Sequence, residues 1–237
     1  MMKVLRCLIV TGILMSLGPW AVMASEGEIA LKTDSNLEVG VRSAEVSANS
    51  VTISNEYLTM MVYPNGNFKG ENAAGEYIFY PGATSALSIK VGSKEYDVYS
   101  LSNYRTKDTF ISPANDKETI TEWDLPEGIH IEQHIWLEGD HAVFAVNMKN
   151  NRDYAQTVSI RYLWDTQLSN NDGSPLKAKG TLYTKEICFK PVDFDHWSAY
   201  SRPDESTAEV VTYGWWANRP DMLIFAHWPH AISTTYS

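Results

Sequence analysis

Three residues of the segment HIEQH could carry out acid–base or metal chemistry: His130, Glu132 and His134. Imidazole and carboxylate groups transfer protons in many enzymes and also bind divalent metals. The segment alternates apolar and polar residues as a strand does, and in a strand two residues four positions apart are separated by about 13 Å. Either histidine can therefore reach Glu132, but the two cannot share one metal ion. The spacing also differs from the HExxH of zinc peptidases, and the alternative is the solvated polar face of a half-buried strand.

A second polar group follows an apolar run in RYLWDTQLSNNDGSPL, residues 161–176. Asp165, Asn171 and Asp172 supply the oxygen atoms that a hard cation prefers, and calcium is the candidate ion. The spacing does not match the acidic positions, glycine and glutamate of an EF-hand loop. The alternative is that these side chains accept hydrogen bonds from turn amides where a strand ends. No other cofactor is expected.

Aromatic residues form the third candidate site, because sugar rings pack on exposed aromatic faces while nearby polar groups bind the hydroxyls. The segment YGWWANRP contains Trp215, Trp216 and Arg219, and we expect these three residues to bind carbohydrate. Adjacent residues of a strand point to opposite faces, so one tryptophan of the pair is expected in the core and the other at the surface. The alternative is that both rings serve packing alone.

The segment DFDHW, residues 193–197, holds two carboxylates and a histidine in an expected loop. Glycoside hydrolysis needs two carboxylates about 5 Å or 6.5–9.5 Å apart, a separation that sequence spacing cannot supply. The alternative is an ordinary acidic surface loop. The chain has no P-loop, no dinucleotide-binding glycine fingerprint, no G-x-S-x-G and no CxxC. Nucleotide, flavin and redox functions are therefore unsupported, and no catalytic residue is assigned.

The first 24 residues have the organisation of a secretory signal peptide. A positively charged start precedes an apolar core of 11 residues, Cys7 to Leu17, and Val22 and Ala24 place small side chains before a cleavage site. The core is short for a membrane span, which needs about 20 residues. We expect a secreted protein, extracellular or periplasmic, with no membrane span after signal removal. The alternative is an uncleaved anchor over Cys7 to Ala24.

The expected mature chain, residues 25–237, is acidic. Removing the two basic residues of the signal leaves 17 lysines and arginines against 29 aspartates and glutamates. Such a negative charge argues against nucleic acid and anionic lipid as partners, because phosphates need a basic patch. A carbohydrate or a cell-surface polymer is the candidate partner, and the oligomeric state is left open.

Stability is expected to come from a hydrophobic core. Cys188 is the only cysteine of the expected mature chain, so no internal disulfide can form. It lies in the strand-like segment EICFK, where we expect a buried, inert thiol and not a reactive one. A chain of this length can bury a sizeable core in a single domain.

Apolar residues recur at every second position along most of the chain, which predicts strands. In residues 128–151, Ile129, Ile131, Ile135 and Leu137 face one way, and apolar residues return after a turn at 138–140. This pattern predicts a hairpin with one buried face. Residues 50–70 predict another hairpin with an Asn-Gly turn. Further strands are predicted within residues 86–98, 157–167, 180–192, 208–216 and 221–228, and polar loops at 102–117 and 193–206. The pattern predicts one all-β domain over residues 25–237, an antiparallel β-sandwich with little helix.

The segment RYLWDTQLSNNDGSPL resembles the signature R-x-L-x-D-T-x-x-x-x-N-D-G-x-P of a group of secreted archaeal and bacterial proteins with a galactose-mutarotase-like β-supersandwich. The segments SNEYLTMMVYPNGNFKG, EGIHIEQHIWL (with its central Gln133) and MLIFAHWPH are similar to other strands of that group. The resemblance covers roughly Val51 to His230 and implies a supersandwich and secretion, without catalytic residues to transfer.

This chain departs from that group in two places. It has Gln167-Leu168-Ser169 after Asp-Thr, where the group has a small residue and glycine. The group also continues into further strands, which implies that the chain is truncated at Ser237.

Two functions from different classes follow from these observations. The first is a secreted or cell-surface β-sandwich module, non-catalytic, that binds carbohydrate or serves a structural role. The alternative is a carbohydrate-active enzyme domain, mutarotase-, epimerase- or lyase-like, in which histidine and carboxylate side chains transfer protons. The enzyme predicts that His130 or His134 converges with Glu132 or an aspartate. A calcium ion that stabilises the loop at Asp165 and Asp172 is a third hypothesis.

Overall fold

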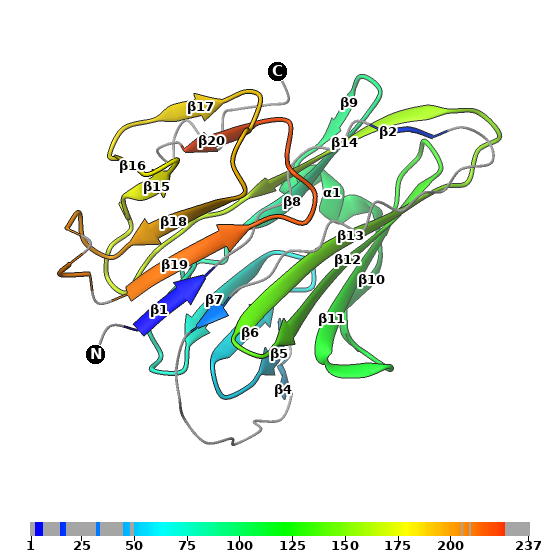
Figure 1. Ribbon diagram of the computed structural model, residues 1–237. Helices are drawn as coiled ribbons and strands as arrows, with labels where there is room; N and C mark the ends of the chain where they lie inside the picture. The colour runs from blue at the N-terminus through cyan, green and yellow to red at the C-terminus, as the bar shows by residue number, and fades with distance from the viewer. Residues whose placement is uncertain are drawn as a thin grey trace.

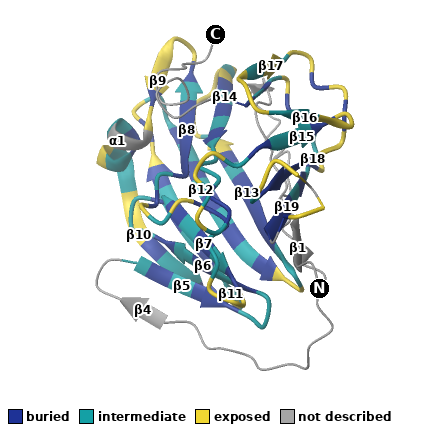
Figure 2. Ribbon diagram, turned by 90° about the vertical axis from the view of Figure 1, so that its left-hand side faces the viewer, coloured by how far each residue is buried: buried dark blue, intermediate teal, exposed yellow. Residues whose placement is uncertain are grey.

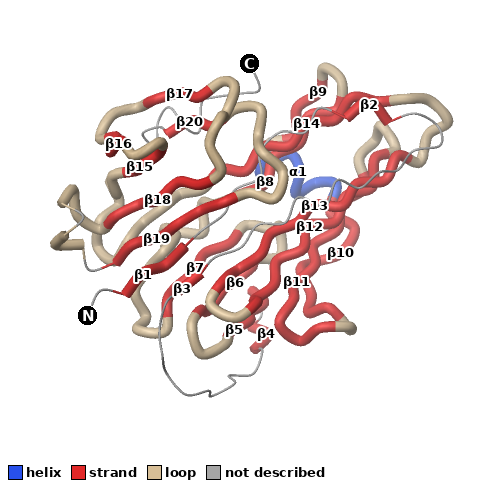
Figure 3. Tube along the Cα trace, in the orientation of Figure 1, coloured by secondary structure: helices blue, strands red, loops and turns tan. Residues whose placement is uncertain are grey.

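The computed structural model of the protein describes residues 50–204, 206–208 and 210–225. It also gives the backbone of four short earlier strands, β1 (Lys3–Arg6), β2 (Met15–Leu17), β3 (Lys32–Thr33) and β4 (Glu45–Ser47). Strands dominate the described chain, and helix within it is limited to α1 (Val98–Leu101) and a 3-10 turn at Ser102–Tyr104 (Figure 3). Antiparallel sheets pack against one another (Figure 1), which confirms the predicted all-β sandwich.

The sheet β4-β5-β6-β7 contains the predicted Asn-Gly hairpin. Strand β5 (Ser50–Ser54) pairs with β6 (Leu58–Val62), and β6 pairs with β7 (Phe68–Asn72). Gly66 closes the β6–β7 turn at φ +83°, a conformation that favours glycine. A Cβ atom at this position would lie 2.7 Å from the buried ring of Trp123, so a larger residue is excluded on both grounds.

A second sheet, β2-β14-β8-β9, contains β8 (Ala86–Val91), β9 (Lys94–Tyr96) and β14 (Gln156–Leu163). An aromatic cluster joins this sheet to its neighbours. Phe68 of β7 lies 4.9 Å from Phe144 and 5.5 Å from Trp164, measured between ring centroids. Phe144 in turn lies 4.7 Å from Trp164. Three sheets therefore share one core.

The third sheet, β10-β11-β12-β13, is built from β10 (Arg105–Ser112), β11 (Asn115–Asp124), β12 (Ile129–Glu138) and β13 (His141–Asn150). The β12–β13 pairing is regular over all ten residues of each strand, as predicted. The prediction of a loop at residues 102–117 was wrong, because β10 and the start of β11 occupy most of it. Repeated shifts of register between β10 and β11 interrupt the two-residue period that would have revealed these strands.

The remaining strands form a sheet of β15 (Leu176–Ala178), β16 (Thr181–Tyr183), β18 (His196–Tyr200) and β19 (Val210–Trp215), with β1 and β3 beyond β19. Beside it, β17 (Ile187–Phe189) pairs with β20 (Leu223–Phe225). The prediction of a loop at 193–206 was wrong for residues 196–200, where β18 lies. The expectation of a buried Cys188 was also wrong: its side chain is exposed, between the partly buried Ile187 and Phe189 of β17.

Burial alternates along most strands (Figure 2). On β12, every odd-numbered position from 129 to 137 is buried and the even-numbered positions are at least partly exposed. One large core contains most of the buried apolar residues, including Trp123 and Trp197. No helix in the described part of the chain is long and apolar enough to cross a membrane.

Candidate functional site

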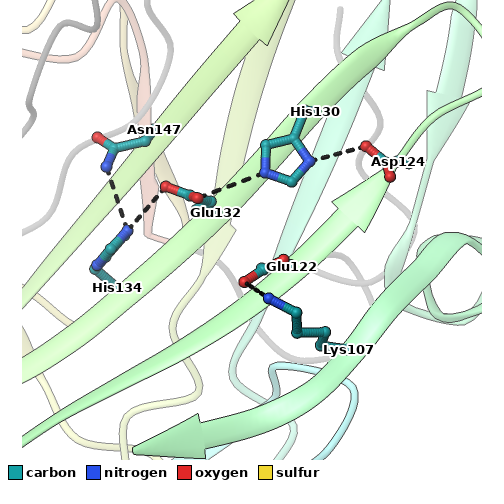
Figure 4. Close-up of polar contacts among 7 residues, drawn as sticks. All are labelled: Lys107, Glu122, Asp124, His130, Glu132, His134 and Asn147. Atoms are coloured by element: carbon teal, nitrogen blue, oxygen red, sulfur yellow. Dashed lines mark hydrogen bonds and ion pairs between the residues drawn. The ribbon is translucent and has the colours of Figure 1, made fainter. Parts of the chain in front are cut away.

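The outward side chains of β12 form a row of polar contacts with the strands on either side (Figure 4). Because β12 alternates, His130, Glu132 and His134 all point away from the buried face. Asp124 and Glu118 of β11 reach this row from one side, and Asn147 of β13 from the other. We call these six residues the outer ladder.

The buried side of the same strand holds the ladder in place. Ile131 and Ile135 are fully buried, and Gln133 between them is buried as well. The Gln133 amide donates to the Gly66 carbonyl at 2.8 Å, and its oxygen accepts from the Tyr162 hydroxyl at 3.4 Å. Gln133 therefore ties β12 to the Asn-Gly turn and to β14, because a buried amide without partners would be costly.

The ladder alternates carboxylates and imidazoles. His130 Nδ1 lies 2.8 Å from Asp124 Oδ1, and its Nε2 lies 3.5 Å from Glu132 Oε1. Glu132 Oε2 lies 3.3 Å from His134 Nε2, and His134 Nδ1 lies 2.8 Å from Glu118 Oε1. Each histidine thus reaches Glu132, as the strand spacing predicted, and each has a second carboxylate on its other nitrogen.

The charge on the imidazoles decides which ladder contacts are hydrogen bonds. A neutral ring carries one N–H and can donate to one of its two carboxylate neighbours, whereas an imidazolium donates to both. Asn147 Nδ2 lies 3.2 Å from His134 Nε2, so this amide can donate to the ring when that nitrogen lacks a proton. The row can therefore hold or transfer protons without moving its backbone.

Glu132 is the ladder carboxylate whose pKa is shifted by its neighbours. Burial alone would raise the pKa of Glu132, but hydrogen bonds from His134 and His130 outweigh burial and hold that pKa below its ordinary value. Glu122 lies directly across from Glu132 on β11, a placement that would be repulsive by itself. Lys107 of β10 offsets the repulsion between the two carboxylates, because its Nζ lies 2.7 Å from Glu122 Oε1.

The two histidines of the ladder do not meet at one point, because each contacts a different oxygen of Glu132. No group of three or more histidine, cysteine, aspartate or glutamate side chains in the described chain is placed to hold a metal ion. The two imidazoles instead contact opposite oxygens of Glu132. This arrangement suits hydrogen bonding and proton transfer.

The loop of residues 165–174 is held by hydrogen bonds within it and to neighbouring segments. The Asn171 amide donates to the Ser201 carbonyl at 2.8 Å, and its oxygen accepts from the Gly173 amide at 2.9 Å. The Asp165 carboxylate accepts a hydrogen bond from the Thr84 hydroxyl. These are contacts with turn amides and side chains, the alternative to a calcium site that the sequence left open. Calcium binding at Asp165, Asn171 and Asp172 stays a prediction.

The surroundings of the Asp165 carboxyl shift its pKa. Burial raises the pKa of the Asp165 carboxyl above its ordinary value, and the hydrogen bond from Thr84 opposes that shift. The nearby Asp172 carboxylate raises the pKa further by repulsion. Asp165 and Asp172 are therefore close enough to interact, as the sequence grouping suggested.

The two adjacent tryptophans face opposite ways. Trp216 is buried, and its indole N–H donates to the Phe194 carbonyl at 2.9 Å. Trp215 is partly exposed, and its ring contacts His141 of β13 at a centroid distance of 5.5 Å. Arg219 is exposed and forms an ion pair with Asp195. Trp215 and Arg219 are the members of the predicted carbohydrate-binding set with surface to offer a ligand.

The carboxylates of the DFDHW segment are paired separately. Asp193 lies 2.7 Å from Lys179 Nζ, and Asp195 pairs with Arg219. The hydrogen bond from Lys179 holds the pKa of Asp193 below its ordinary value. Phe194 between them is buried. Each carboxylate thus has its own cation.

Sequence reasoning missed the ladder members that come from other strands. Glu118 and Asn147 lie on the neighbouring strands and reach HIEQH only through strand pairing, and Asp124, six residues before His130, reaches it across the turn between β11 and β12. The alternation in KETITEWD, residues 117–124, was the available signal, since it places Glu118, Glu122 and Asp124 on one face.

Comparison with known proteins adds no assignment. No protein-family model matches the chain, and no curated protein matches it with significant similarity.

Proposed function

We propose that the protein is a secreted or cell-surface module that binds carbohydrate on the outer face of β11–β13. The outer ladder carries this proposal. Its planar hydrogen-bonding groups are fixed in orientation by one another and by the buried face of β12, yet they remain partly exposed. Sugars are bound by such preoriented polar groups beside an aromatic ring.

An aromatic residue supplies the apolar part of this surface. Trp136 is partly exposed and lies two positions from His134 on the outward face of β12. Its counterpart on β11 is Glu118, the ladder carboxylate bound to His134. A ring beside fixed carboxylates matches the two faces of a sugar, apolar C–H groups and hydroxyls. The resemblance to galactose-mutarotase-like proteins supports the same ligand class.

The proposal is tested by calorimetric titration of wild type and two variants against a panel of oligosaccharides. Glu132→Gln keeps the shape but removes the charge that orders both histidines, so we expect affinity for a bound glycan to fall at least about tenfold. Glu138→Gln removes the same charge from an exposed position of the same strand and should change affinity less than about twofold. Absence of binding across the panel, or equal losses in both variants, would refute the proposal.

A carbohydrate-active enzyme is the second candidate, and one observation favours it. Glu132 lies between two imidazoles whose far nitrogens each contact a further carboxylate. Such a row can take a proton at one end and release one at the other. Incubating reducing sugars with the protein and following anomer exchange by NMR separates the candidates: accelerated exchange lost in Glu132→Gln and His134→Gln would establish the enzyme.

A further inference from the structure

One end of the outer ladder places an aromatic ring beside a carboxylate that is largely out of water. Trp136 of β12 pairs with Glu118 of β11 and with Val143 of β13. Only 18% of the Glu118 side chain is exposed, compared with 35% for Glu132. Glu132 lies further along β12, about 13 Å from Trp136 at the spacing of a strand. A glycan that stacks on the Trp136 ring is therefore closer to Glu118 than to Glu132.

The ladder is negatively charged in every protonation state of its histidines. It contains three carboxylates, Glu118, Asp124 and Glu132, and two imidazoles. The carboxylates outnumber the imidazoles even when both rings carry a second proton. Hydrogen bonds from the histidines also hold the pKa of Glu132 below its ordinary value, so this carboxylate stays ionised at neutral pH.

The two lysines beside the ladder do not offset this charge at its Trp136 end. Lys107 is already paired, because its Nζ lies 2.7 Å from Glu122 Oε1. Lys149 of β13 lies opposite His130, at the other end of the row, which is about 20 Å from Trp136 at the spacing of a strand. A negative group on a molecule bound at Trp136 would therefore be repelled, and partial burial keeps that repulsion from being fully screened.

We propose that this surface binds uncharged oligosaccharides and rejects those that contain uronate. The inference rests on the proposed function, because it names the class of glycan that the same surface takes. Glu118 Oε1 is held by His134 Nδ1 at 2.8 Å, which leaves Oε2 to accept a hydrogen bond from a sugar hydroxyl. A uronate carboxylate in the place of that hydroxyl has no proton to donate and brings a second negative charge. The surface thus selects by repulsion as well as by attraction.

Galactotriose with trigalacturonate, and mannotriose with trimannuronate, serve as matched probes. Within each pair of the same linkage, only a hydroxymethyl group and a carboxylate differ. We expect calorimetric titration at neutral pH to show that the neutral member of a pair binds at least about tenfold more tightly. Equal or tighter binding of the uronate would overturn this inference and leave the proposed function standing. Binding of neither member of either pair would also overturn it, and the wider oligosaccharide panel then decides the proposed function separately.

Variants locate the charge that rejects the uronate. Glu118→Gln keeps the shape and removes the charge, so the ratio of neutral to acidic affinity should fall at least about threefold. Glu138→Gln makes the same change at an exposed position of β12 and should alter the ratio less than about twofold. Equal changes in the two variants would show diffuse repulsion from an acidic protein and overturn the assignment. If Glu118→Gln does not fold, Glu122→Gln provides the comparison, because it frees the Lys107 cation beside the ladder.

Discussion

Glu132 and Asp165 are the central carboxylates of the two polar regions, and their pKa values move in opposite directions. Glu132 lies on a strand, where period-two alternation and pairing bring imidazoles to it from the same face. Asp165 lies where a strand ends, beside another carboxylate and partly out of water. A strand thus brings complementary side chains to a carboxylate, whereas the polar groups of the loop bond to its own backbone, to the Ser201 carbonyl and to the Thr84 hydroxyl.

The largest expected effect contrasts two buried glutamines, one behind the ladder and one in the loop. Gln133→Ala removes bonds to Gly66 and Tyr162 and leaves a cavity, so we expect a loss of about 2–4 kcal/mol in the free energy of unfolding. Gln167→Ala removes one bond to the Ser169 carbonyl and should cost about 1 kcal/mol. Urea denaturation measures the free energy of unfolding of both variants. Equal losses would contradict the expected difference between the two glutamines.

Two asparagines give the next contrast. Asn171→Ala breaks the bonds to Ser201 and Gly173 that close the loop, and we expect it to cost about 1–3 kcal/mol. Asn147→Ala removes a partly exposed ladder contact and should cost less than about 1 kcal/mol. Thermal melts of the two variants show which substitution lowers stability more. A larger loss for Asn147→Ala would show that the ladder contributes more to stability than the loop does.

The opposite pKa shifts predict opposite dependences of stability on pH. The pKa of Glu132 is lowered by folding, so its contribution is present above the ordinary glutamate pKa and is lost as pH falls through the folded value. The pKa of Asp165 is raised by folding, so ionised Asp165 destabilises the protein at neutral pH and this penalty disappears as pH falls.

Paired unfolding curves between about pH 3 and 7 test these signs. The free energy of unfolding of wild type should exceed that of Glu132→Gln by less as pH falls. The free energy of unfolding of wild type should instead rise relative to that of Asp165→Asn. Differences that run in the same direction for both variants would show that the two carboxylates do not differ in this way.

The smallest expected effect concerns Asp172. Its charge raises the pKa of Asp165, so Asp172→Asn should relieve repulsion and raise the stability of the metal-free protein by a few tenths of a kcal/mol. A melt with EDTA and with calcium supplies the complementary test. A calcium-dependent rise in melting temperature that Asp172→Asn abolishes would establish the loop as a cation site.

Strand alternation made the hairpin of β12 and β13 predictable in detail, including the reach of both histidines to Glu132. The same rule failed for β10, because its register with β11 shifts repeatedly. The expectation of a buried Cys188 failed although alternation holds on β17, because Ile187 and Phe189 take the partly buried positions and leave Cys188 exposed between them.

The ladder was predictable only in part. Its three central residues are neighbours in sequence, whereas Glu118 and Asn147 reach the ladder only through strand pairing. The contact between His141 and Trp215 was not predictable, since the two residues come from strands that are far apart in the sequence. Local periodicity specifies which way a side chain points, and long-range packing specifies what it meets.

The exposed thiol of Cys188 gives the molecule a built-in attachment point. The sequence contains two cysteines, and the other, Cys7, lies in the expected signal peptide. A maleimide dye would therefore label the described part of the chain at one position, Cys188 on β17, opposite Ile224 of β20. Energy transfer from the tryptophans to that dye would report opening of the β17–β20 ribbon without any engineered residue.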